Sequence, residues 1–210
     1  MTVPLVTVHT TTYNHAPYIG QAIEGALQQK TNFPIEIVIG EDCSTDGTRE
    51  IVFDYQAKYP DIIRVITSDK NVGSKENSRR VREASRGKYI ALCEGDDYWT
   101  DPYKLQKQVT FLENNQDYAV VHSDADVLSQ DSGKLYKSTN KWLSGAIPSG
   151  YIYEDLLVRN SIGTLTVLIR NSILLNTKKV HPRGIRQKLE NGRLSFMVRD
   201  IQAPQNSLYG

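Results

Sequence analysis

A chain of 210 residues with 39% hydrophobic content can bury roughly 70% of its unfolded surface as one domain. Twenty-five basic against 24 acidic side chains leave a formal net charge of +1, so no global charge favours nucleic acid or an acidic membrane surface. Residues 1–5 lack the basic and apolar regions of a signal peptide, and no stretch approaches the roughly 20 apolar residues of a membrane span. The sequence predicts a soluble cytoplasmic protein.

Apolar, strand-like runs alternate with helical patterns along the chain. The expected strands are 3–10, 35–39, 62–66, 89–93 and 118–121. The expected helices follow Pro17, residues 46–48 and Asp101-Pro102, with one more across 77–85. This alternation predicts an α/β fold with a mostly parallel central sheet and helices on both faces. In such a sheet, ligands bind outside the carboxyl ends of the strands.

An acidic cluster, Glu94-Gly95-Asp96-Asp97, directly follows the apolar run 89–93. Carboxylates grouped at the end of a buried strand repel one another unless a divalent cation neutralises them. The cluster therefore predicts a site for Mg²⁺ or Mn²⁺ that would suit a diphosphate-bearing substrate; the alternative is a solvated acidic turn. Asp124 and Asp126 form a rival pair, which ranks lower because one of the two acids should face outward.

Polar side chains also follow the first two expected strands. Thr11 and Tyr13 come after the first strand, and Asp42 comes after the second. Asp42 could accept a hydrogen bond from a base or ribose, or it could be a turn residue. Tyr13 could stack on a nucleobase or cover the end of the sheet. The sequence contains no glycine-rich phosphate loop, so phosphates would be met by a metal.

Histidines and cysteines show no metal-binding pattern. The four histidines lack the spacing of zinc ligands, which argues against a zinc site. Cys43 and Cys93 each end an apolar run and are expected to be buried, reduced thiols rather than a disulfide.

Three sequence blocks together carry a resemblance to a known family. They are residues 11–15 (TTYNH), 41–48 (EDCSTDGT) and 87–99 (GKYIALCEGDDYW). In order and spacing they resemble family 2 of the inverting glycosyltransferases, which have the Rossmann-like GT-A fold, and the likeness runs from about residue 4 to about residue 175. A nucleotidyltransferase would share the sheet and the acids, but residues 10–14 lack its glycine-rich basic loop.

The resemblance implies roles for particular residues. Thr11, Tyr13 and Asp42 would hold the nucleoside, Asp96 the ribose, and Asp97 the metal that bridges the diphosphate. It also implies direct displacement at the anomeric carbon of a nucleoside-diphosphate sugar, with a carboxylate base that deprotonates the acceptor hydroxyl. The acceptor would be a glycan or lipid-linked glycan in surface-polysaccharide synthesis, and the enzyme cytoplasmic or peripheral at the inner membrane face. Segments 147–151 and 164–167 resemble acceptor-side segments of such enzymes.

The end of the chain departs from the family pattern. Close relatives would carry the base in a segment like Met-Gly-Asp-Tyr-Pro-Leu-Trp, which is absent here. One codon choice for residues 188–198, read one base later, encodes Asn-Trp-Lys-Met-Gly-Asp-Tyr-Pro-Leu-Trp. We therefore hypothesise a frameshift upstream, which divides the chain into a domain over 1–175 and an atypical tail over 176–210. Glu190 and Asp200 are the weak remaining candidates for the base.

Two functional alternatives follow from this departure. The chain is either a metal-dependent glycosyltransferase or a catalytically inactive form that binds the nucleotide sugar without a general base. Residues 181–210 have few apolar side chains in periodic order, which predicts a tail without stable structure.

Overall fold

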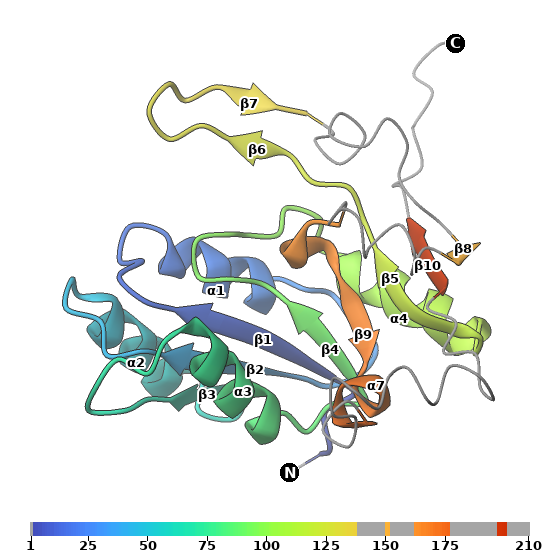
Figure 1. The fold of residues 1–210 in the computed structure, drawn as a ribbon, viewed down its shortest axis with the longest axis horizontal. Helices are drawn as coiled ribbons and strands as arrows, with labels where there is room; N and C mark the ends of the chain where they lie inside the picture. Colours follow the sequence, from blue (N-terminus) through green and yellow to red (C-terminus); the bar gives the residue numbers. More distant parts are fainter. Residues whose placement is uncertain (1, 138–149, 152–161, 177–196, 201–210) are drawn as a thin grey trace, which may run out of the picture.

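A central sheet of eight strands organises the chain, in the order β3-β2-β1-β4-β9-β5-β10-β8 (Figure 1). The computed structural model describes residues 2–137, 150–151, 162–176 and 197–200. The early strands are β1 (Val6–Thr12), β2 (Ile35–Glu41), β3 (Ile63–Ile66), β4 (Tyr89–Leu92) and β5 (Tyr118–His122). The later strands are β8 (Gly150–Tyr151), β9 (Leu168–Arg170) and β10 (Met197–Asp200). A separate hairpin, which projects from the sheet in Figure 1, pairs β6 (Val127–Leu128) with β7 (Leu135–Tyr136).

Helices lie on both faces of this sheet, as the sequence predicts. They are α1 (Ile19–Leu27), α2 (Thr48–Lys58), α3 (Ser74–Ala84), α4 (Lys104–Asn114) and the short α7 (Asn171–Asn176). Successive β1 residues point to opposite faces. Val8 belongs to the hydrophobic cluster that includes buried residues of α1, α2 and α4. His9 points the other way, toward α3, where its Nε2 lies 3.2 Å from Ser78 Oγ. In the described part of the chain, no helix combines the length and apolar character needed to cross a bilayer.

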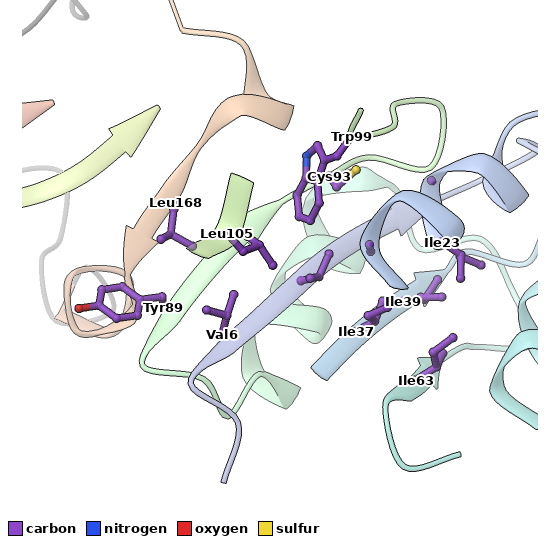
Figure 2. Packing of buried hydrophobic residues seen from close by; sticks show 14 of the residues in the cluster. Val6, Ile23, Ile37, Ile39, Ile63, Tyr89, Cys93, Trp99, Leu105 and Leu168 are labelled. Carbon is purple, nitrogen blue, oxygen red and sulfur yellow. The ribbon is translucent and has the colours of Figure 1, made fainter. Parts of the chain in front are cut away.

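The main core lies between the sheet and the α1–α2–α4 layer (Figure 2). Val6, Ile37 and Ile39 supply its sheet side and are at most 1% exposed. Trp99 closes the core at the end of β4, beside Cys93 (Figure 2). The thiol of Cys93 is free and buried, as expected from the sequence, whereas that of Cys43 is free and only partly buried.

Parallel pairing brings three strand ends to one edge of the sheet. β1 runs parallel to both β2 and β4, with Thr12 opposite Glu41 and His9 opposite Leu92. Beyond the paired residues, the Thr12 carbonyl accepts the Asp42 N–H at 3.1 Å, and the Thr11 carbonyl accepts the Gly95 N–H at 2.9 Å. The loops that follow β2 and β4 are thus both bonded to the end of β1, which confirms that the predicted site regions converge.

Strand β9 was not predicted. It lies antiparallel between β4 and β5, so that Leu168 is opposite both Ala91 and Val121. Directly before it, residues Thr164–Thr166 form a 3-10 turn, η1. Three residues are too few to show a strand period in sequence. The position of β9 between β4 and β5 places the 163–167 segment against the end of β4.

The expectation that residues 181–210 lack regular structure is wrong for 197–200. These residues form β10, which pairs parallel with β5 and antiparallel with β8. The pairing satisfies backbone groups that β5 would otherwise leave open at its edge, which outweighs the weak apolar pattern of the segment. Asp200 is opposite His122, at the carboxyl end of β5. Glu190 lies outside the described residues.

Candidate functional site at the carboxyl edge of the sheet

Three carboxylates gather in the loop that follows β4. Glu94, Asp96 and Asp97 each offer one oxygen, and these oxygens lie within 4.8 Å of one another. Within the ranges that the structure describes, this is the only such group of three or more acidic, histidine or cysteine ligands. The rival pair is not part of it: Asp126 instead forms an ion pair with Lys137 at 2.7 Å.

The electrostatics of this acidic loop favour a bound cation. Burial, followed by the charges of Asp96 and Glu94, raises the pKa of Asp97 to about 6. Burial and the charge of Asp96 also raise the pKa of Glu94. An octahedral cation with ligands at about 2.1 Å spans about 4.2 Å between opposite oxygens, so small side-chain rotations would bring these groups into range. The donor set consists of hard oxygens, and it fits Mg²⁺ or Mn²⁺.

Cation binding at the acidic loop should depend on pH in the range set by Asp97. Its raised pKa means that the carboxyl keeps its proton up to about pH 6, and a cation must displace that proton. We expect Mn²⁺ affinity to fall by about tenfold per pH unit below about pH 6 and to level off above it, the change expected for one displaced proton. Calorimetry from pH 5 to 8 measures this; a flat profile would remove Asp97 from the ligand set.

His15 is a site residue that sequence reasoning missed. A Cβ placed on Gly95 would lie 2.9 Å from His15 Nδ1 and 2.6 Å from Thr12 Oγ1, so the acidic loop runs directly over both side chains. Both atoms are buried and have no hydrogen-bond partner among the residues that the structure describes. The charge of His15 lowers the pKa of Asp97 and of Glu94, against the stronger effects that raise them. Its place in the 11–15 block is the only feature of the sequence that points to a role in the site, because its spacing from the other histidines does not match a zinc site.

Asp42 is already engaged by the protein. It is 3% exposed, and its carboxylate accepts the N–H of Val72 at 2.7 Å and of Gly73 at 2.9 Å. The turn role considered in sequence is therefore present, and each oxygen keeps a lone pair for a further donor. The adjacent Glu41 is fully buried and binds Arg49 at 2.7 Å.

Tyr13 and Thr11 lie at the same edge, in or just after the end of β1. The Tyr13 side chain is 44% exposed, which leaves part of its ring open to a ligand. Thr11 is partly buried, and its carbonyl holds the acidic loop through Gly95.

The loops after β1 and β2 are bonded to each other. Asn14, in the first loop, both donates to and accepts from the second loop. Its N–H donates to Ser44 Oγ at 3.0 Å, and its Oδ1 accepts the Thr45 N–H at 2.9 Å. The His15 N–H also donates to Thr48 Oγ1 at 2.8 Å. Asn14 has a φ of 54°, in the left-handed region that asparagine tolerates better than most residues. We call residues 13–16 and 44–48 the braced loops.

Comparison with known proteins places this geometry in a family. The sequence matches Glycosyl transferase family 2 over residues 7–174. It is 42% identical to an uncharacterised protein of Mycobacterium tuberculosis over 162 residues, 75% of this chain and 44% of that protein. It is 33% identical to TuaG of Bacillus subtilis, named for teichuronic acid biosynthesis, over 166 residues, 79% of this chain and 62% of that protein. The chain thus spans about half the length of the curated relatives it matches.

Solved structures share the fold. S. aureus TarS 1-349 in complex with UDP aligns with a TM-score of 0.62 at 20% identity, covering 87% of this chain and 52% of that one. The mannosyltransferase PcManGT from Pyrobaculum calidifontis, in complex with GDP-Man and Mn²⁺, aligns with a TM-score of 0.62 at 15% identity, covering 99% and 59%. With its mostly parallel sheet between helices and a family match over most of its length, the chain belongs to glycosyl transferase family 2 and has the GT-A fold.

Proposed function

We propose that this chain binds a nucleoside-diphosphate sugar together with a divalent cation at the carboxyl edge of the sheet. The single observation that carries the proposal is the acidic loop, where three carboxylates with oxygens within 4.8 Å meet the end of β1. The reaction is transfer of the sugar to a hydroxyl of a glycan or lipid-linked glycan in surface-polysaccharide synthesis, in the cytoplasm at the inner membrane face. The name of TuaG supports this class of product.

The residues at this edge would each bind a different part of the donor. Asp97 would hold Mg²⁺ or Mn²⁺, which when bound supplies the positive charge that stabilises a departing diphosphate. Asp96 would accept from the ribose, and Tyr13 would cover the base with its exposed ring. Thr11 and Asp42 would complete the nucleoside pocket. Calorimetry with UDP or GDP, with and without Mn²⁺, tests this function, and binding that ignores the cation would contradict it.

Transfer also needs a base for the acceptor hydroxyl, worth roughly 10²–10⁴-fold in rate. Asp200 is the candidate that falls on the sheet, because β10 places it opposite His122 at the carboxyl end of β5. The second candidate function is a nucleotide-sugar-binding form that lacks a base, which the absence of the family segment from 188–198 favours. Donor hydrolysis and transfer assays on this chain and on Asp200→Asn separate the two. Transfer that falls 10²-fold or more in Asp200→Asn would support the base.

Asp42→Ala should weaken UDP or GDP binding without changing Mn²⁺ affinity, by the roughly 1.5–3 kcal/mol of a hydrogen bond to a charged group. The substitution also releases the turn at Val72 and Gly73, so a matched variant is needed. Asn71→Ala provides it, because Asn71 Oδ1 accepts the Gly73 N–H at 3.0 Å in the same turn. Equal losses in both variants would show that Asp42 is only a turn residue.

A further inference from the structure

A lysine is buried beside Trp99, just beyond the acidic loop, and forms no ion pair within the described residues. Lys104, the first residue of α4, is 8% exposed. Its Nζ donates to Gln108 Oε1 at 2.9 Å and lies 4.3 Å from the centre of the Trp99 ring. Burial lowers its pKa to about 7. Burying an ionisable side chain in such a place is costly.

The hydrogen bond from Lys104 orients the amide of Gln108. Because Lys104 Nζ donates to Gln108 Oε1, the carbonyl oxygen of the Gln108 side chain faces the lysine. The amide nitrogen must then point the other way, and it donates to the Thr166 carbonyl at 2.8 Å. Gln108 is 1% exposed, so water does not compete for either group.

The residues on either side of the acidic loop bind the same turn. Before the loop, the Leu92 N–H donates to the Val167 carbonyl at 3.2 Å. After the loop, Trp99 Nε1 donates to the Leu165 carbonyl at 2.9 Å. Figure 2 shows Trp99 beside Cys93 at the end of β4, with Leu105 of α4 below it. With Gln108, three donors from three separate points hold three consecutive carbonyls, those of 165–167.

We propose that Lys104 is a positioning residue, which acts through Gln108 and Trp99 to hold the 163–167 turn against the acidic loop and so sets the spacing of its carboxylates. The inference rests on the proposed function for its effect on cation binding, but the hydrogen bonds that join the turn to Leu92, Trp99 and Gln108 stand without it. The contacts of Lys104 are with Trp99 and Gln108 and not with the carboxylates, so its substitution reaches the acidic loop through these two side chains.

Lys104→Met separates positioning from stability. Methionine fills the space of the stem, and replacing a buried charge by an apolar side chain is often neutral or stabilising. The substitution also leaves the buried Gln108 Oε1 without its donor, which costs about 1–3 kcal/mol, so we expect a melting temperature equal to that of the unmodified chain or a few degrees lower. With the Gln108 amide no longer oriented, the Val167 amide, which donates to the Thr164 carbonyl within the turn, should exchange about tenfold faster, the upper effect of one lost hydrogen bond. Mn²⁺ affinity should fall by about tenfold, since a displaced partner of a metal ligand costs about 10–100-fold.

Two further variants complete the test. Gln108→Glu keeps an acceptor for Lys104 but turns a carboxylate oxygen toward the Thr166 carbonyl, and it should release the turn as Lys104→Met does. Lys107→Met, on the same helix, removes only a half-exposed ion pair with Asp101 and should change neither quantity. In a Trp142→Phe background the indole N–H signal of Trp99 is the only one, and its hydrogen-exchange rate in ligand-free protein reports the bond to Leu165.

The outcomes are distinguishable. Faster exchange of the Val167 amide and of the Trp99 indole N–H, with weaker Mn²⁺ binding, in both Lys104→Met and Gln108→Glu supports the inference. Exchange and indole signals like those of Lys107→Met would overturn it, whatever the cation does. Absence of Mn²⁺ binding in the unmodified chain would overturn the proposed function instead, and the ligand-free measurements would still decide whether Lys104 holds the turn.

Discussion

Replacing Asp97 by asparagine should abolish the cation-dependent part of UDP or GDP binding. A neutral amide removes the charge that a hard cation needs from its ligand. We expect the loss of Mn²⁺ affinity to exceed the roughly 10–100-fold seen when outer partners of metal ligands are changed. Calorimetry with and without Mn²⁺ measures the effect on both affinities.

The fold should survive this substitution and even gain stability at neutral pH. The pKa of Asp97 is raised in the folded chain, so the ionised carboxylate above about pH 6 costs folding free energy in the absence of a cation. Asparagine removes that cost, and the melting temperature at pH 8 should stay equal or rise. Asp126→Asn is the matched control, because it changes an acid of the rival pair that forms an ion pair with Lys137 and lies outside the acidic loop. Cation dependence retained in Asp97→Asn and lost in Asp126→Asn would move the site.

Gly87→Ala should strongly destabilise the domain. A Cβ at this position would lie 2.5 Å from the Thr7 nitrogen and 2.8 Å from the Val6 carbonyl carbon, both backbone atoms of the central strand β1. Backbone within the sheet has little room to move, so the clash must displace β1 or β4. We expect a loss of about 3 kcal/mol or more in the free energy of unfolding. At about 2–4 °C per kcal/mol for a chain of this size, the melting temperature should fall by about 6–12 °C.

Gly20→Ala is the control for this prediction. A Cβ at Gly20 meets only the Tyr55 hydroxyl at 3.8 Å, an ordinary contact, and the residue lies within α1. Alanine should therefore be neutral or stabilising by about 0.5–1 kcal/mol, because it restricts the unfolded chain. Thermal unfolding of the two variants side by side measures the contrast. Similar midpoints would mean that the β1–β4 junction is looser than the structure shows.

The alternating part of the fold was predictable because its pattern is strong. Ile19, Ile23 and Ala26 recur at helical spacing and are buried in α1, the helix predicted after Pro17. The prediction failed at one helix boundary and at two short strands. Helix α3 starts at Ser74 rather than near residue 77, because Gly73 takes a φ of 84° that a sequence pattern does not reveal. β9 and β10 depend on pairing with distant strands, which decides their structure more than their own few residues do.

The candidate site was predictable as a place, less so as a set of contacts. The acidic loop and the end of β1 were expected at one edge, and their hydrogen bonds bring them there. The engagement of Asp42 by Val72 and Gly73 was not visible, since it joins residues 30 and 31 positions apart. Lys104 was missed because lysine side chains are normally exposed. Its burial depends on its contacts with the Trp99 and Gln108 side chains, which the sequence pattern does not reveal.

The braced loops have a kinetic consequence for the proposed donor. Their backbone amides at residues 14, 15 and 45 are satisfied by side chains of the opposite loop before any ligand arrives. A nucleotide that binds against these loops does not have to order them, which lowers the entropy cost of association. Ligand-free and bound loops should then share one conformation, and association should be limited by encounter rather than by a slow closure of this part of the pocket.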